Sequence, residues 1–182
     1  IIITGAGDAF CGGLDLAGIR AGGDPLEYAA CLAKLLKVFP RLTKPVAAAV
    51  NGDAVASGGS IAAACDYAVI VDHALIGSYE VSVGVWPMVA QVPLIHRIGT
   101  KRAMENIGSG NPFPAKRAWE VGLVNVVVKP AHLLETTREW LREATRGGAA
   151  NAGRVSFYEL AEMSYDDALD AALDKFAAQF RK

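Results

Sequence analysis

Cysteine is scarce in this chain, and the few cysteines are not placed for a disulfide framework. Only three occur among the 182 residues, at Cys11, Cys31 and Cys65. Their number is odd, they lie far apart, and no pair has C-x-x-C spacing. This pattern favours reduced, packed thiols over the cross-linked scaffold of a small secreted domain. We therefore expect a cytoplasmic protein.

The chain also lacks an excess of either charge and a long apolar run. Its 18 basic and 19 acidic residues give a net charge of −1. Nothing in that balance attracts nucleic acid or an anionic membrane. No apolar stretch reaches the roughly 20 residues that a membrane-spanning helix needs. With 52% hydrophobic residues the composition is typical of a compact globular domain, and we expect neither nucleic acid nor a membrane as a partner.

Signatures of several cofactor sites are missing too. The three histidines, His73, His96 and His132, are scattered, and none has metal-ligand spacing to another histidine or cysteine. The sequence contains neither a G-x-S-x-G elbow nor a Walker loop. Residues 5–10 (GAGDAF) lack the third glycine of the dinucleotide fingerprint, which leaves a Rossmann-type binder as a remote alternative. We expect no metal and no separate cofactor.

Short continuous apolar runs alternate with amphipathic segments along the chain. The runs predict buried strands and the amphipathic segments predict helices, which together favour an α/β fold with a largely parallel sheet. We expect a small-residue linker at residues 147–153. The predicted strands lie at residues 1–4, 46–50, 67–71 and 124–128, and the predicted helices lie at residues 25–39, 61–65, 100–107, 115–121 and 131–146 and after Ser164.

The stretch from Asn51 to Asp66 organises the rest of the chain. It follows a predicted strand and passes through the small residues Ser57-Gly58-Gly59-Ser60 into a predicted helix. Such a helix start presents backbone N–H groups without partners, which can hold an oxygen that becomes charged during a reaction. The same residues would also suit a tight turn that only lets the helix approach the strand.

A second glycine turn and one acidic residue complete a possible site. Gly12-Gly13-Leu14 follows another predicted strand, and N–H groups from two turns can converge on one oxygen. That arrangement is an oxyanion hole, suited to a thioester carbonyl that becomes an enolate. Enolate chemistry also needs a base. Glu80, the only acidic residue between Asp72 and Glu105, is flanked by apolar residues and is the candidate, although it could be a solvated loop glutamate.

Three segments in this order resemble the crotonase superfamily, the enoyl-CoA hydratase/isomerase family. They are IIITGAGDAFCGGLDL, KPVAAAVNGDAVASGGSIAAACDYAV and ALIGSYEVSVGVWP. The resemblance implies oxyanion donors at the N–H groups of Leu14 and Ser57, and an acid–base residue at Glu80. The residues expected around the substrate are Gly12, Gly13, Gly58, Ser60 and Trp86.

The resemblance also implies a fold and an assembly. The expected architecture is a spiral of ββα units, with a core at residues 1–112 and a C-terminal helical, trimerisation region at residues 113–182. The expected substrate is an acyl-CoA thioester, and the expected assembly is a homotrimer or a hexamer. Family members carry further strands before the first segment, and Ile1 opens on a strand with no neighbour before it. We therefore expect that the sequence begins inside a domain.

Three positions depart from the family pattern. Ser57 replaces a glycine, although only its N–H group is needed. Ser60 stands where the hydratases carry a second glutamate, and a serine cannot act as a carboxylate at neutral pH. A single glutamate fits isomerisation of a double bond better than hydration. The segment from Trp86 to Val89 lacks the usual glycine-rich continuation, which predicts a bulkier acyl pocket.

Two alternatives remain open at this point. The first is another reaction of the same superfamily, such as decarboxylation or thioester hydrolysis. The second is an acyl-CoA-binding subunit without catalysis, which the missing second glutamate would allow and the presence of Glu80 disfavours.

Overall fold

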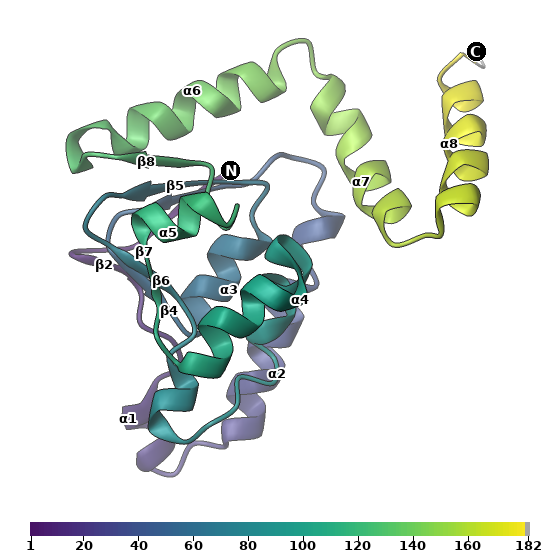
Figure 1. Ribbon diagram of the computed structural model, residues 1–182. Helices are drawn as coiled ribbons and strands as arrows, with labels where there is room; N and C mark the ends of the chain where they lie inside the picture. The colour runs from purple at the N-terminus through teal and green to yellow at the C-terminus, as the bar shows by residue number, and fades with distance from the viewer. Residues whose placement is uncertain (181–182) are drawn as a thin grey trace.

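The computed structural model describes residues 1–180, which form two four-stranded sheets with helices packed around them (Figure 1). The first sheet has the order β1-β3-β5-β8 and is parallel throughout. The second has the order β2-β4-β6-β7, and only its last pair is antiparallel. The strands are β1 (Ile2–Thr4), β2 (Ala9–Cys11), β3 (Ala47–Val50), β4 (Asp53–Val55), β5 (Tyr67–Val71), β6 (Leu75–Gly77), β7 (Phe113–Pro114) and β8 (Val126–Val128).

Strands β1 to β6 alternate between the two sheets, so each of the first three turns of the chain adds one strand to each sheet. Strands β1 and β2 precede α2 (Pro25–Leu36), β3 and β4 precede α3 (Ser57–Ala64), and β5 and β6 precede α4 (Gln91–Ser109). This repeated β-β-α turn confirms the expected spiral. The other helices are α1 (Leu16–Arg20), α5 (Ala115–Glu120), α6 (Leu133–Thr145), α7 (Ala149–Ala161) and α8 (Tyr165–Gln179), with 3-10 turns η1 (Phe39–Arg41), η2 (Glu80–Val83) and η3 (Pro130–His132).

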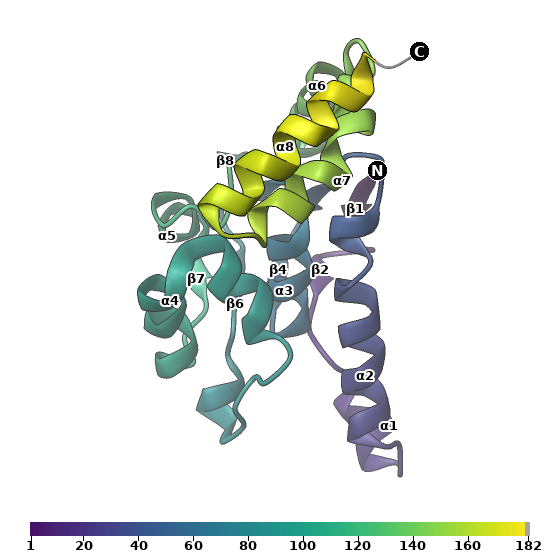
Figure 2. The same cartoon turned by 90° about the vertical axis from the view of Figure 1, so that its right-hand side faces the viewer.

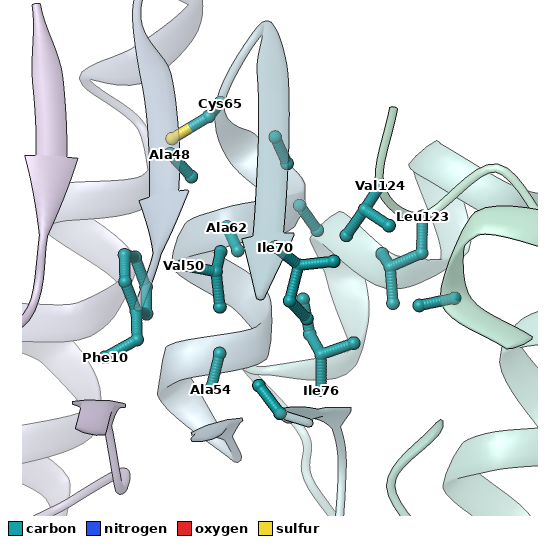
Figure 3. Packing of buried hydrophobic residues seen from close by; sticks show 14 of the residues in the cluster. Phe10, Ala48, Val50, Ala54, Ala62, Cys65, Ile70, Ile76, Leu123 and Val124 are labelled. Carbon is teal, nitrogen blue, oxygen red and sulfur yellow. The ribbon is translucent and has the colours of Figure 1, made fainter. Parts of the chain in front are cut away.

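Strand β3 lies inside the first sheet because its sequence suits burial on both faces. All its residues are fully inaccessible to solvent, and it pairs in parallel with both β1 and β5. Figure 3 shows Val50 in the same core as Phe10, Ala62 of α3 and Ile70 of β5. Each large apolar side chain buried in this way contributes about 1.5–3 kcal/mol. The core thus fixes the positions of the turns that follow β2 and β4.

Helix α6 covers the first sheet, as Figure 1 shows for β5 and β8. The ring of Trp140 stacks on that of Tyr67, with centroids 4.5 Å apart and planes inclined by 6°. Thr137 of the same helix is fully buried, and its hydroxyl donates to the carbonyl of Leu133. Strands β7 and β8 follow residue 112, and each belongs to one of the two sheets.

A buried ion pair fastens α7 to this core. Arg154 donates from Nε and Nη2 to the two carboxylate oxygens of Asp66, at 2.7 and 2.8 Å. Its Nη1 donates to the carbonyls of Phe39 and Leu42, and the hydroxyl of Tyr158 donates to Asp66. Beyond α7, helix α8 lies apart from both sheets (Figure 1). Figure 2 shows α1 and α2 together at the end of the molecule opposite α6.

Two helix boundaries differ from the sequence-based expectations. Helix α4 begins at Gln91 rather than Thr100, because Pro93 is tolerated in the first turn and Gly99 (φ 76°, ψ 161°) divides the helix into two parts. The amphipathic pattern after Thr100 describes only the second part. The linker predicted up to Gly153 is wrong, since α7 begins at Ala149, directly after Gly148 with its positive φ. Among residues 1–180 no helix is long and apolar enough to cross a membrane.

Candidate active site

A cavity of about 250 Å³ lies between α2, the start of α3, and the segment of residues 79–90. Four of the predicted site residues, Leu14, Ser57, Glu80 and Trp86, line this one cavity. Its wall is otherwise largely apolar. The remaining lining residues are Leu16, Ala29, Leu32, Ala56, Tyr79, Val83, Val85, Pro87, Met88, Val89 and Ala90.

The two glycine turns meet at one wall of the cavity. A Cβ atom on Gly58 would lie 2.3 Å from the carbonyl oxygen of Cys11, so only glycine lets α3 approach the end of β2 this closely. A Cβ atom on Gly13 would lie 3.8 Å from the backbone nitrogen of Ser57. The structure therefore brings together two turns that are more than forty residues apart in the sequence.

Two backbone donors in these turns have no partner among residues 1–180. Ser57 is the first residue of α3, where helix geometry supplies no acceptor for the N–H group. Within residues 1–180 neither Leu14 N nor Ser57 N has a hydrogen-bond acceptor. Both N–H groups belong to residues that line the cavity. They can therefore serve an oxygen atom bound there.

Ala56, which the sequence does not single out, shapes the turn before Ser57. It has φ 53° and ψ −121°, and it is the only residue other than glycine with positive φ among residues 1–180. Such a conformation costs on the order of 1–3 kcal/mol for a side chain with a Cβ atom. A hydrogen bond of 2.8 Å from Ala56 N to the carbonyl of Gly77 helps to hold it. An alanine gives no signal in the sequence that it adopts this geometry.

Glu80 begins the 3-10 turn η2 and is half-buried at the cavity. Its Oε2 atom accepts hydrogen bonds from the hydroxyl of Ser78, at 2.5 Å, and from the N–H of Tyr79, at 3.0 Å. It is the single carboxylate among the described residues that line the cavity. The arrangement places one possible proton acceptor beside two free N–H donors.

Of the other predicted site residues, only Trp86 lines the cavity. Ser60 is fully buried, and its hydroxyl donates to the carbonyl of Ala90 at 2.5 Å, so it lies outside the lining of the cavity. Gly12, Gly13 and Gly58 are also absent from that lining and contribute the path of the backbone. Trp86 does line the cavity and donates from Nε1 to Gln91 Oε1 at 3.0 Å.

A larger cavity, of about 630 Å³, lies between α2, α4 and α7. It contains none of the predicted site residues and shares only Met88 and Val89 with the smaller cavity. Within residues 1–180 no group of three or more His, Cys, Asp or Glu side chains could hold a metal ion. The smaller cavity is therefore the candidate active site, because the free donors and the carboxylate are there.

Similar solved structures share this architecture. An enoyl-CoA hydratase from Mycobacterium smegmatis has a TM-score of 0.93 at 28% identity, over 100% of this chain and 72% of that one. An enoyl-CoA hydratase from Bacillus anthracis has a TM-score of 0.88 at 29% identity, over 97% of this chain and 70% of that one. The two-sheet spiral is thus the fold of these enzymes.

Sequence relatives agree with the structural ones. A putative enoyl-CoA hydratase from Thermus thermophilus is 34% identical over 152 residues, which are 80% of this chain and 60% of the relative. A crotonyl-CoA hydratase from Syntrophomonas wolfei is 29% identical over 99% of this chain and 72% of the relative. The chain therefore spans between three-fifths and three-quarters of the length of these two relatives. The model of the enoyl-CoA hydratase/isomerase family matches residues 1–179, and the chain belongs to that family.

Proposed function

We propose that the protein acts on acyl-CoA thioesters through an enolate intermediate. The N–H groups of Leu14 and Ser57 would bind the thioester oxygen, and Glu80 would move the proton. The observation that carries this proposal is the shared cavity, where one carboxylate lies beside two N–H groups without acceptors. Donors fixed in advance stabilise the charge that develops on the oxygen, at about 3–4 kcal/mol for each donor in known cases.

Isomerisation of a double bond fits the site better than hydration. Hydration needs one group to activate water and another to deliver or hold a proton, whereas isomerisation needs one base that carries a proton between two carbons. Glu80 is the single carboxylate in the described lining, and the hydroxyl of Ser60 is buried and bonded to Ala90. The CoA moiety is part of the substrate, so no separate cofactor is required.

The names of the relatives favour hydration instead, since several are called hydratases. Hydration is therefore the main competing reaction. Decarboxylation, thioester hydrolysis and acyl-CoA binding without turnover are further alternatives. The position of Glu80 beside the free donors disfavours a role in binding alone.

We also propose a homotrimer or hexamer. Four apolar residues of α8 and its C-terminal end, Leu169, Leu173, Phe176 and Phe180, are each more than half exposed. An exposed apolar stripe of this kind is characteristic of a protein–protein contact. Light scattering on the full-length protein would test the assembly, and a monomer would exclude it.

The decisive experiment compares two reactions of the full-length protein. We expect a higher kcat/KM for conversion of a 3-enoyl-CoA to the 2-enoyl-CoA than for hydration of the 2-enoyl-CoA. Faster hydration would contradict the preference for isomerisation. Binding of both thioesters without any turnover would favour the binding subunit.

A further inference from the structure

The carboxylate of Glu80 is held through one of its two oxygen atoms. Oε2 accepts from Ser78 Oγ at 2.5 Å and from Tyr79 N at 3.0 Å. Within residues 1–180 no group donates to Oε1. The two donors fix the orientation of the carboxylate and leave Oε1 for a substrate in the cavity that Glu80 lines.

Ser78 is itself held by an amide from another element. Asn106, on α4, accepts from the N–H of Ser78 through Oδ1 at 2.7 Å. Its Nδ2 donates to the carbonyls of Ser78, at 3.2 Å, and of Asn111, at 2.7 Å. The amide orientation is determined because Oδ1 meets an N–H group and Nδ2 meets two carbonyls.

Close packing makes this connection rigid. Ser78 and Asn106 are each 1% exposed. The preceding residue, Gly77, has φ 126°, and a Cβ atom there would lie 2.4 Å from Asn106 Oδ1. Buried polar groups that are all satisfied in this way order their surroundings, since an unpaired one would be costly.

We propose that Ser78 is a positioning residue for Glu80, held in place by Asn106, so that proton transfer runs through Glu80 Oε1 alone. The inference rests on the proposed acid–base role of Glu80. In isomerisation the C2–H bond breaks, its electron pair passes into the dienolate, and the proton bonds to Oε1. The proton then leaves Oε1 for C4, where dienolate electrons form the new C–H bond and the double bond settles between C2 and C3.

A matched pair of variants separates this role from general loop stability. Ser78→Ala removes the hydroxyl that donates to Glu80. Ser82→Ala removes a hydroxyl of the same loop that donates only to the carbonyl of Tyr79, at 2.6 Å, and does not line the cavity. Circular dichroism and thermal unfolding would check both folds. Ser78→Cys, which keeps the shape but donates more weakly, is the second variant if Ser78→Ala fails to fold.

The first readout does not depend on turnover. The carboxyl carbon of Glu80 is observed by NMR at one fixed pH, and its signal is assigned by its absence in Glu80→Gln. We expect its chemical shift to change in Ser78→Ala, and less so in Ser78→Cys, because the carboxylate loses a donated hydroxyl. Ser82→Ala should leave the chemical shift in place. Equal chemical shifts in all variants would overturn the inference.

The second readout is kinetic. We expect Ser78→Ala to lower kcat about 10- to 100-fold with KM nearly unchanged, because the base is misplaced while the binding surface is intact. A wild-type kcat in Ser78→Ala would contradict the positioning role. If the wild-type protein turns over neither thioester, the proposed function fails, and the NMR comparison still decides whether Ser78 orients Glu80.

Discussion

Gly13 and Ala56 face each other so closely that a Cβ atom on Gly13 would lie 2.8 Å from the Cβ atom of Ala56. Gly13 also has φ 103°, a conformation that residues with side chains rarely adopt. Position 13 therefore requires glycine for two independent reasons. Through this contact the turn that carries Leu14 lies against the start of α3, and the two proposed oxyanion donors reach the same cavity.

The strained backbone of Ala56 can be relieved by one substitution. We expect Ala56→Gly to raise the free energy of unfolding by about 1 kcal/mol, because glycine adopts φ 53° without the steric cost. Urea denaturation at constant m-value measures the change. The control is Ala62→Gly inside α3, the same substitution in helical backbone, which should be destabilising. A loss of stability in both variants would show that Ala56 is unstrained.

The donor role of Ser57 predicts a contrast between two substitutions. Ser57→Pro removes the N–H group at the first position of α3, where helices tolerate proline, and we expect kcat to fall about 100-fold. Ser57→Ala keeps the N–H group and should stay within about threefold of the wild type. Circular dichroism would check that both retain α3. A similar loss of kcat in both would show that the side chain of Ser57 is needed.

The ion pair between Arg154 and Asp66 should contribute strongly to stability. The arginine side chain is 5% exposed and that of Asp66 is 14% exposed. We expect Arg154→Met to lower the free energy of unfolding by about 3–5 kcal/mol, because it leaves a carboxylate largely buried without its partner. Arg146→Met, which breaks the exposed pair with Glu143, is the control and should cost less than about 1 kcal/mol. Equal effects would mean that α7 is held mainly by other contacts.

The buried thiol of Cys65 predicts a loss of stability at alkaline pH. Burial, and secondarily the charge of Asp66, raises the pKa of this thiol from 9.0 to about 12. The folded state keeps the proton over this range while the unfolded state loses it. The contribution of the protonated thiol to the free energy of unfolding is therefore fully present below pH 9. It declines by up to about 1.4 kcal/mol per pH unit toward pH 12. Cys65→Ala should show a shallower alkaline decline in chemical denaturation, and an unchanged slope would contradict the assignment.

The sequence predicted the longer strands and helices and several residues that line the candidate active site. The apolar run at residues 46–50 predicted a buried strand, and Pro25 after Asp24 predicted the start of α2. Leu14 and Ser57, which the family resemblance implied as donors, and Glu80, the loop glutamate, line one cavity. Their roles in catalysis stay predictions.

Other features could not be read from the sequence. The strands β2, β4, β6 and β7 have two or three residues each, too few to show a period of two. The sequence also gives no sign that Ser60 is buried where α3 packs against residue 90. Ser78, which donates to Glu80, is held by Asn106, a residue 28 positions away in the sequence that only the fold brings close. Tertiary packing determines these contacts, and local sequence patterns do not predict them.

The most direct measurement of the proton-transfer role is kcat of Glu80→Gln on the preferred enoyl-CoA. A glutamine oxygen can accept the hydrogen bonds from Ser78 and Tyr79, so the loop should keep its shape. Glu27→Gln, on the exposed first turn of α2 and outside the cavity, is the control. If Glu80 carries the proton, kcat falls at least about 100-fold, equivalent to about 3 kcal/mol, while affinity for a saturated acyl-CoA is retained. A loss smaller than about tenfold, with binding intact, would show that another group moves the proton.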